Sequence, residues 1–187
     1  FSITVDNVND APTITGTPST SVDEDEAYSF TPTGSDDDAG TTLVYSITGT
    51  PTWASFDTAT GALTGTPNNS NVGTDSDIVI TVSDGTATAS LSSFSITVSN
   101  INDAPTITSS ASFTAEENQT SVGTVEASDP EDNTLSYSIS GNELQIDSST
   151  GVITFVSAPD YETKSSYTST VTASDTTLSD SQEITVT

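Results

Sequence analysis

Apolar and polar residues alternate along much of the chain with a period of two. The clearest runs are Leu43–Ile47, Ile78–Val82, Leu135–Ile139, Tyr167–Ala173 and Ile184–Val186. Such alternation places apolar side chains on one face of a strand and polar ones on the other. Gly-containing turn signals separate the runs, and no segment has a helical period longer than one turn. The pattern predicts an all-β protein.

A thirteen-residue segment occurs twice and predicts the domain organisation. Residues 1–13 recur as residues 94–106 with two differences, at an offset of 93 residues. A module of that length suits a seven-stranded sandwich. We therefore expect two tandem seven-stranded Greek-key β-sandwiches joined end to end. They occupy residues 11–101 and 102–187, and residues 1–10 form the last strand and linker of a preceding module, so the chain is expected to be an internal fragment of a larger protein.

The composition excludes several classes of function. The 187 residues include 27 acidic side chains, one basic side chain, 37 Thr and 32 Ser, but no His, Cys or Met, and the net charge is −26. One lysine cannot supply the basic surface that nucleic acids or anionic lipids require. Without His and Cys there is no Ser-His-Asp triad, thiol nucleophile or ordinary zinc site. No apolar run reaches the roughly 18 residues of a membrane-spanning helix, so we expect no membrane insertion.

The acidic residues gather at positions that a sandwich brings to its two ends. Mutual repulsion disfavours such groups of carboxylates unless cations join them. Only oxygen donors are present, and these select hard cations, with Ca²⁺ a better match than Mg²⁺ or a transition metal. Composition alone leaves a second interpretation open, in which the acids are solvated loop residues that keep the protein soluble.

The second module resembles a cadherin repeat along nearly its whole length. Six segments carry the resemblance in order: the linker 100–104, the acidic motif 115–118, the Asp-x-Asp-like segment 127–133, the Asp-x-x-Thr-Gly-x-Ile-like segment 146–153, the Asp-x-Glu motif 160–162 and the Val-x-Ala-x-Asp motif 171–175. The resemblance implies a calcium-binding adhesion fold.

The first module resembles the dystroglycan-type cadherin-like repeat of large bacterial surface proteins. The segments that carry this resemblance are 51–57, 60–67, 71–74 and 82–85. Trp53 and Phe56 could form a platform for a sugar ring, but the family pattern and the apolar context favour core packing.

The resemblance implies three groups of Ca²⁺ ligands. Between the modules these are Glu24, Asn100, Asn102, Asp103, Asp129, Glu131 and Asp175. At the start of the first module they are Asn9, Asp10, Asp36, Asp38 and Asp84, and at the end of the second they are Glu117, Asp160 and Glu162. Asn69 and Asn71 stand where the family has Asp-x-Glu, and both linkers begin with Asn instead of Asp. Because affinity falls with ligand charge, we expect one or two ions at the Asp103 end instead of the usual three.

These features together predict a non-enzymatic, calcium-rigidified extender or adhesion segment of a large secreted bacterial cell-surface adhesin. Its expected partners are neighbouring modules, other adhesin molecules or cell-surface polysaccharides, and its expected location is extracellular. One alternative is a calcium-dependent carbohydrate-binding module of a secreted polysaccharide-degrading system. A glycosidase with paired carboxylates is a weaker alternative, because the expected fold offers no deep pocket for a sugar.

Overall fold

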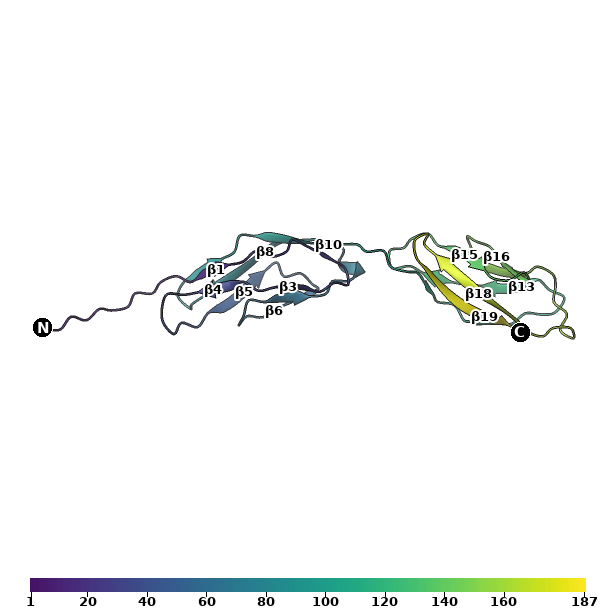
Figure 1. The fold of residues 1–187 in the computed structure, drawn as a ribbon, viewed down its shortest axis with the longest axis horizontal. Helices are drawn as coiled ribbons and strands as arrows, with labels where there is room; N and C mark the ends of the chain where they lie inside the picture. Colours follow the sequence, from purple (N-terminus) through teal and green to yellow (C-terminus); the bar gives the residue numbers. More distant parts are fainter. The chain divides into compact units, whose positions relative to one another are not determined.

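The computed structural model describes residues 1–187, and the chain forms two compact units, residues 1–101 and 102–187. Both units are built from β-strands (Figure 1), and the one helical element is the three-residue 3-10 turn η1 (Asn69–Asn71). None of the elements is a helix with the length and apolar character needed to cross a membrane. The prediction of an all-β protein is confirmed.

Unit one contains ten strands: β1 (Thr13–Thr15), β2 (Ser21–Asp23), β3 (Tyr28–Phe30), β4 (Thr33–Ser35), β5 (Val44–Thr48), β6 (Ala54–Phe56), β7 (Leu63–Gly65), β8 (Gly73–Ser83), β9 (Thr88–Ser90) and β10 (Phe94–Ser99). One sheet has the order β2-β10-β8-β5, with β9 also paired to β8. A second sheet has the order β3-β7-β6, and β1 pairs with β4. The β2–β10 pair is parallel, and the other pairs are antiparallel.

Unit two repeats this plan with nine strands: β11 (Thr106–Ile107), β12 (Ser112–Phe113), β13 (Ser121–Thr124), β14 (Ala127–Ser128), β15 (Ser136–Ile139), β16 (Leu144–Ile146), β17 (Val152–Phe155), β18 (Tyr167–Ser174) and β19 (Ser179–Val186). Its sheets have the orders β12-β19-β18-β15 and β13-β17-β16, and β11 pairs with β14. The parallel pair is here β12–β19.

The extra strands are pieces of interrupted strands. The first strand of each unit is split because its two halves pair with different neighbours: β1 pairs with β4 but β2 with β10, and β11 pairs with β14 but β12 with β19. Pro32, which lacks an N–H, separates β3 from β4. If the pairs β1/β2, β3/β4, β9/β10, β11/β12 and β13/β14 are each counted as one strand, both units have the expected seven.

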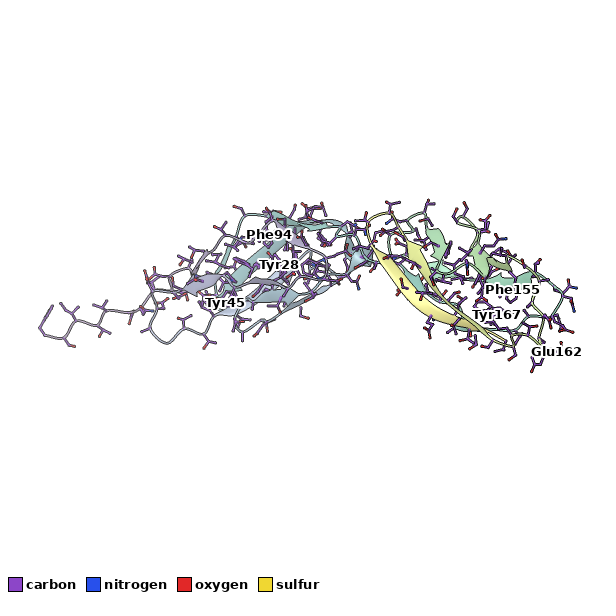
Figure 2. All side chains as sticks on the ribbon, turned by 45° about the vertical axis from the view of Figure 1, so that its right-hand side comes forward. Tyr28, Tyr45, Phe94, Phe155, Glu162 and Tyr167 are labelled. Carbon is purple, nitrogen blue, oxygen red and sulfur yellow. The ribbon has the colours of Figure 1, made fainter.

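Each sandwich encloses its own apolar core. In unit one, Ile78, Ile80 and Val82 of β8 are fully buried, while Val79 and Thr81 between them are partly exposed. Burying one such side chain contributes about 1.5–3 kcal/mol. The rest of this core is Tyr28, Phe30, Tyr45, Leu63 and Ile96; Figure 2 labels its Tyr28 and Tyr45, together with Phe94, which packs against it.

Unit two follows the same alternation with a separate set of residues. Its buried residues are Ile107, Val125, Leu144, Ile153, Phe155, Val171, Ala173, Ile184 and Val186. Tyr167 packs against this core, and its ring meets the Phe155 ring edge-on at a centroid distance of 4.9 Å. The two cores share no residue, so each unit has an independent source of stability.

Hydroxyl groups cover the outward faces of the strands. Thr172 Oγ1 and Ser181 Oγ lie 2.8 Å apart on neighbouring strands β18 and β19, and Thr81 Oγ1 and Ser90 Oγ lie 2.7 Å apart on β8 and β9. Thr is β-branched and suits a strand, while its hydroxyl remains compatible with water. This placement accounts for the high Thr and Ser content without any function for the individual residues.

Residues 1–10 include a sequence typical of a strand but do not pair with any other strand. They contain no regular secondary structure, and Ile3 and Val5 expose 76% and 88% of their surface. Residues 94–98, which have the same sequence as residues 1–5, lie in β10, where Ile96 and Val98 are buried between paired strands. The predicted strand is not formed here, because an isolated strand has no partner for its backbone hydrogen bonds. That residues 1–10 belong to a preceding module stays a prediction.

A left-handed glycine fixes the turn before β17. Gly151 has φ +71°, its N–H donates to the Asp147 carbonyl at 2.9 Å, and its carbonyl accepts from the Val125 N–H at 2.9 Å. A Cβ added at this position would collide with the Val125 carbonyl oxygen. By contrast, a Cβ at Gly141 (φ +84°) would come no closer than 3.8 Å to Ser169 Oγ.

We predict that Gly151→Ala destabilises unit two more than Gly141→Ala. Both variants carry the left-handed cost of about 1 kcal/mol, and only Gly151→Ala must also displace backbone. Denaturant unfolding should give a loss of more than about 2 kcal/mol for Gly151→Ala and about 1 kcal/mol for Gly141→Ala. Equal losses would mean that the close approach of Val125 is unimportant.

Trp53 packs against the core of unit one. Its ring meets Tyr28 edge-on at a centroid distance of 5.7 Å, and its Nε1 donates to Asp75 Oδ2 at 2.9 Å. The side chain is partly buried beside the core cluster, as is Phe56. The preference for core packing over a sugar platform therefore agrees with the structure.

We predict that Trp53→Ala lowers the stability of unit one by about 2–3 kcal/mol, since a large ring and its packing are removed. The exposed Ser55 on β6, two residues after Trp53, provides the matched control, because Ser55→Ala removes no packing. Calorimetry of both variants would check this. Similar unfolding temperatures for the two would show that Trp53 does not support the core.

Candidate metal centre

The buried charged side chains of the chain are Glu24, Asp129 and Asp175, which expose 3%, 8% and 7% of their surface. All three belong to the predicted ligand set. Burial of a carboxylate is unfavourable unless a cation or hydrogen-bond donors compensate for the lost hydration. The one basic side chain, Lys164, forms an exposed ion pair with Glu143, with Nζ 2.6 Å from Oε2. The protein therefore supplies no cation to its buried carboxylates.

The N-terminal end of unit two gathers five predicted ligands, which we call cluster 2: Asn102, Asp103, Asp129, Glu131 and Asp175. Asp129 Oδ1 accepts the N–H groups of Glu131 and Asn133 at 3.0 and 3.1 Å. Asp129 Oδ2 is buried and has no hydrogen-bond partner. An unpaired buried carboxylate oxygen is the donor that a bound cation would use.

Asp175 is held in cluster 2 by hydrogen bonds within its own turn. Its Oδ1 accepts the N–H groups of Thr177 and Leu178 at 2.6 and 2.7 Å. Its Oδ2 accepts from Asn102 Nδ2 at 2.7 Å. The hydrogen bond from Asn102 and those from the Leu178 and Thr177 backbone lower the pKa of Asp175 below its ordinary value, so this carboxylate is ionised at neutral pH.

Two linker residues complete cluster 2. The Asp103 N–H donates to Glu131 Oε2 at 3.1 Å, and Asn102 Nδ2 also donates to the Asp103 carbonyl at 3.0 Å. Asn102 is thereby joined to a side chain 73 positions later in the sequence, and Asp103 to a side chain 28 positions later. The structure brings all five predicted ligands of this cluster together.

Unit one carries a second copy of this arrangement, cluster 1: Asn9, Asp10, Asp36, Asp38 and Asp84. Asn9 Nδ2 donates to Asp84 Oδ2 at 2.9 Å, as Asn102 does to Asp175. The Asp10 N–H donates to Asp38 Oδ2 at 2.8 Å, which parallels the Asp103–Glu131 contact. Asp36 Oδ2 is buried and unpaired, like Asp129 Oδ2. The repeated linker sequence Asn-Asp thus makes the same contacts in both units, although the loops that carry Asp36 and Asp129 differ in sequence.

Hydrogen bonds also lower the pKa of two acids of cluster 1, Asp84 and Asp38. The Ala87 N–H, the Asn9 side chain and the Thr86 N–H lower the pKa of Asp84 below its ordinary value. The pKa of Asp38 is lowered chiefly by Asn7, whose Nδ2 lies 2.7 Å from Asp38 Oδ1. Asn7 was not among the predicted ligands, although it occupies the repeat position of the predicted Asn100.

The remaining predicted ligands of unit one lie at its C-terminal end. Glu24 Oε1 accepts the Ile101 N–H at 2.8 Å, and its Oε2 is buried without a partner. Asn100 is exposed. Asn71, which stands where the family has an acidic residue and was not a predicted ligand, accepts the Asn68 N–H at its Oδ1 at 3.0 Å in the capping box of η1, so its side chain stabilises that turn.

Cluster 3 consists of Glu117, Asp160 and Glu162. One carboxylate oxygen from each lies within 4.8 Å of the others, and all three side chains are exposed. Figure 2 places Glu162 at the end of unit two opposite to the entry of the chain. Thr163 Oγ1 donates to Asp160 Oδ2 at 2.9 Å, and the Tyr161 N–H to Glu117 Oε2 at 3.4 Å.

The donor chemistry fits calcium. Clusters 1 and 2 each offer four carboxylates and one amide oxygen on turns and linkers, and Ca²⁺ accepts six to eight such oxygens in flexible geometry. Nitrogen and sulfur ligands are absent from the sequence except for amides and the one lysine, so softer metals have no preferred donor. An ion at either cluster would neutralise the carboxylates and give the unpaired buried oxygen a partner.

Comparison with known proteins agrees with this fold. Residues 11–99 match the family model described as "Putative Ig domain", and residues 111–187 match the model described as "Cadherin domain". A comparison with curated proteins found no match. The family matches thus support an immunoglobulin-like module followed by a cadherin module.

Solved structures of cadherins share the fold over almost the whole chain. "Protocadherin Gamma B2 extracellular cadherin domains 1-5" has a TM-score of 0.59 and 20% identity, and the match covers 96% of this chain and 40% of that one. Domains 3–6 of the same protein have a TM-score of 0.55 and 20% identity over 96% and 50% of the two chains. Mouse Cadherin-23 EC22-24 has a TM-score of 0.51 and 17% identity over 96% and 66%.

This chain therefore spans less than half of the first of these structures and half of the second. Identities near 20% establish likeness of fold and leave individual residue roles to the geometry described above. The prediction of tandem cadherin-like sandwiches is confirmed. The chain combines, in tandem, a region that matches an immunoglobulin-like family and a region that matches the cadherin family.

Proposed function

We propose that this chain is a calcium-binding, calcium-rigidified extender and adhesion segment of a large secreted bacterial cell-surface adhesin. The observation that carries the proposal is the pair of matching clusters, each with an unpaired buried carboxylate oxygen and no protein cation. Solvated surface acids need neither burial nor a repeated geometry. A role in binding a hard cation accounts for both.

Calcium at cluster 2 would act on the chain at the linker. Asn102 and Asp103 directly follow the last residue of unit one, and both are hydrogen-bonded to side chains of unit two. An ion bound by Asp103, Asp129 and Asp175 would hold these linker residues in one conformation, because coordination fixes several oxygens at about 2.3–2.6 Å. Restricted linker torsions make a string of modules stiffer.

The adhesin context rests on similarity of sequence and fold. The cadherin and immunoglobulin-like matches support an adhesion-type, extracellular and typically non-enzymatic module. The resemblance of segments 51–57 and 60–67 to repeats of bacterial surface proteins supports the bacterial assignment. Neighbouring modules and other adhesin molecules are the proposed partners.

We predict that calcium raises the melting temperature of this chain by several degrees or more. An ion that binds only the folded state stabilises it by about 2.7 kcal/mol per site at one hundred times its Kd. Calorimetry should compare chelator, millimolar CaCl₂, millimolar MgCl₂ and NaCl at matched ionic strength. Magnesium should substitute poorly because it requires a tighter octahedral site.

The sodium chloride sample is the control for charge screening. Monovalent salt weakens the repulsion among the carboxylates but forms no coordinate bonds, so it should recover only part of the calcium effect. If NaCl alone gives the full shift, the acids are a solvated surface and the proposed function fails.

We also predict that Asp129→Asn weakens calcium binding at cluster 2 by about tenfold or more, because it removes ligand charge from the buried unpaired oxygen. Asp132→Asn is the matched control, since it makes the same charge change three residues later on an exposed side chain. Asp132 has φ +58°, which Asn also tolerates. Isothermal titration should leave this control near wild type, and equal losses for both variants would indicate a diffuse charge effect.

A further inference from the structure

Asn133, which lies outside the predicted ligand set, contacts two members of cluster 2 at once. Its backbone N–H donates to Asp129 Oδ1 at 3.1 Å. Its side-chain Nδ2 donates to Asn102 Oδ1 at 3.2 Å. The residue therefore joins the loop that carries Asp129 to the linker that carries Asn102.

The contacts of Asn102 fix which way its amide points. Its Nδ2 donates to two acceptors, Asp175 Oδ2 at 2.7 Å and the Asp103 carbonyl at 3.0 Å. Its Oδ1, the other polar atom of the amide, accepts a hydrogen bond from Asn133 Nδ2. The two bonds from Nδ2 already restrain the Asn102 amide, and the bond from Asn133 to Oδ1 adds a third restraint from a different loop.

The orientation of Asn102 matters because Asp175 depends on it. Asp175 is buried, and Asn102 provides the hydrogen bond to its Oδ2, while the Thr177 and Leu178 N–H groups occupy its Oδ1. A chain of side-chain contacts thus runs from Asn133 through Asn102 to Asp175. Loss of the Asn133 contact would therefore loosen the Asp175 carboxylate.

Cluster 1 provides an internal comparison. Asn9 makes the same two nitrogen contacts as Asn102, to Asp84 Oδ2 at 2.9 Å and to the Asp10 carbonyl at 2.7 Å. Gly40 stands 93 residues before Asn133 and has no side chain, and no group donates to Asn9 Oδ1. The third contact is therefore a feature of cluster 2 alone.

We propose that Asn133 is a positioning residue of cluster 2, which sets calcium affinity by fixing the Asn102 amide and, through it, Asp175. This inference rests on the proposed calcium function, and the unpaired buried oxygen of Asp129 identifies the cluster as the site. Partners that orient metal ligands typically change affinity by about tenfold to a hundredfold when they are removed. Asn133→Ala retains the backbone N–H to Asp129 and removes only the contact to Asn102.

A double-mutant cycle in the whole chain tests the proposal. The dissociation constant of the cluster 2 ion, identified as the one whose binding Asp129→Asn weakens, is measured by competition with a chromophoric calcium chelator. The measurement is made for the wild-type chain, Asn133→Ala, Asn102→Ala and the double variant. Asn142→Ala is the control, because Asn142 is an exposed asparagine in another loop of unit two. Melting in excess chelator checks that each variant is folded.

We expect Asn133→Ala to weaken binding about tenfold, with Asn142→Ala unchanged. In the Asn102→Ala background, Asn133→Ala should add less than about a twofold change, because residues that act through one another are not additive. If the effects of Asn133→Ala and Asn102→Ala on the dissociation constant multiply in the double variant, the inference is overturned. It is also overturned if Asn133→Ala binds calcium like Asn142→Ala. Either result would leave the calcium function standing. A wild-type chain that binds no calcium would overturn both.

Discussion

Uncompensated negative charge is the constraint on which the other features of this protein depend. Twenty-seven carboxylates share the chain with one lysine, and that lysine is already paired with Glu143. Clusters 1 and 2 each hold four carboxylates close together, and most of these side chains are at least partly buried; repulsion opposes this arrangement and a divalent cation relieves it. The sandwich faces are, by contrast, covered with neutral hydroxyls. Charge is therefore concentrated on turns and linkers instead of being distributed for solubility.

The folding of each unit and the binding of cations use different residues. The cores are apolar, separate and built on alternating strands, and none of their members is a candidate ligand. The clusters lie on the turns and linkers that these strands position, such as Asp175 immediately after β18 and Asp84 immediately after β8. A change in a ligand should accordingly affect calcium binding and linker order more than the integrity of either core.

Much of the fold followed from the sequence because its signals were local. The alternation at Ile78–Val82 and Tyr167–Ala173 identified β8 and β18, and the Gly-containing turns separated the strands correctly. Strand interruptions were not predicted, since they arise from the exchange of partners between sheets, as for β1 and β2. Residues 1–10 carry a strand sequence and form no strand, because the pattern cannot reveal whether pairing neighbours are present.

The sequence predicted which residues belong to the candidate sites more completely than it predicted the contacts of those residues. The repeat and the family motifs identified every member of clusters 1, 2 and 3, but they could not show that Asp129 Oδ2 and Asp36 Oδ2 are buried and unpaired. Asn7 and Asn133 were missed as contacts of the clusters. An asparagine in an acidic loop has no distinctive sequence signal, and its role depends on which partner the fold places beside it.

If the clusters bind calcium, acids outside them should remain solvated. Two exposed turn acids provide the contrast, because Asp57 and Asp147 also have pKa values lowered by backbone N–H groups yet belong to no cluster. The most direct test is a calcium titration followed by residue-resolved amide NMR. Calcium binding at cluster 2 should give saturable shifts for the amides of Asp103, Glu131 and Leu178, with the amides of Ala59 and Ser149 beside the two turn acids unchanged. Equal, unsaturating shifts at all these positions would contradict specific calcium binding at the clusters.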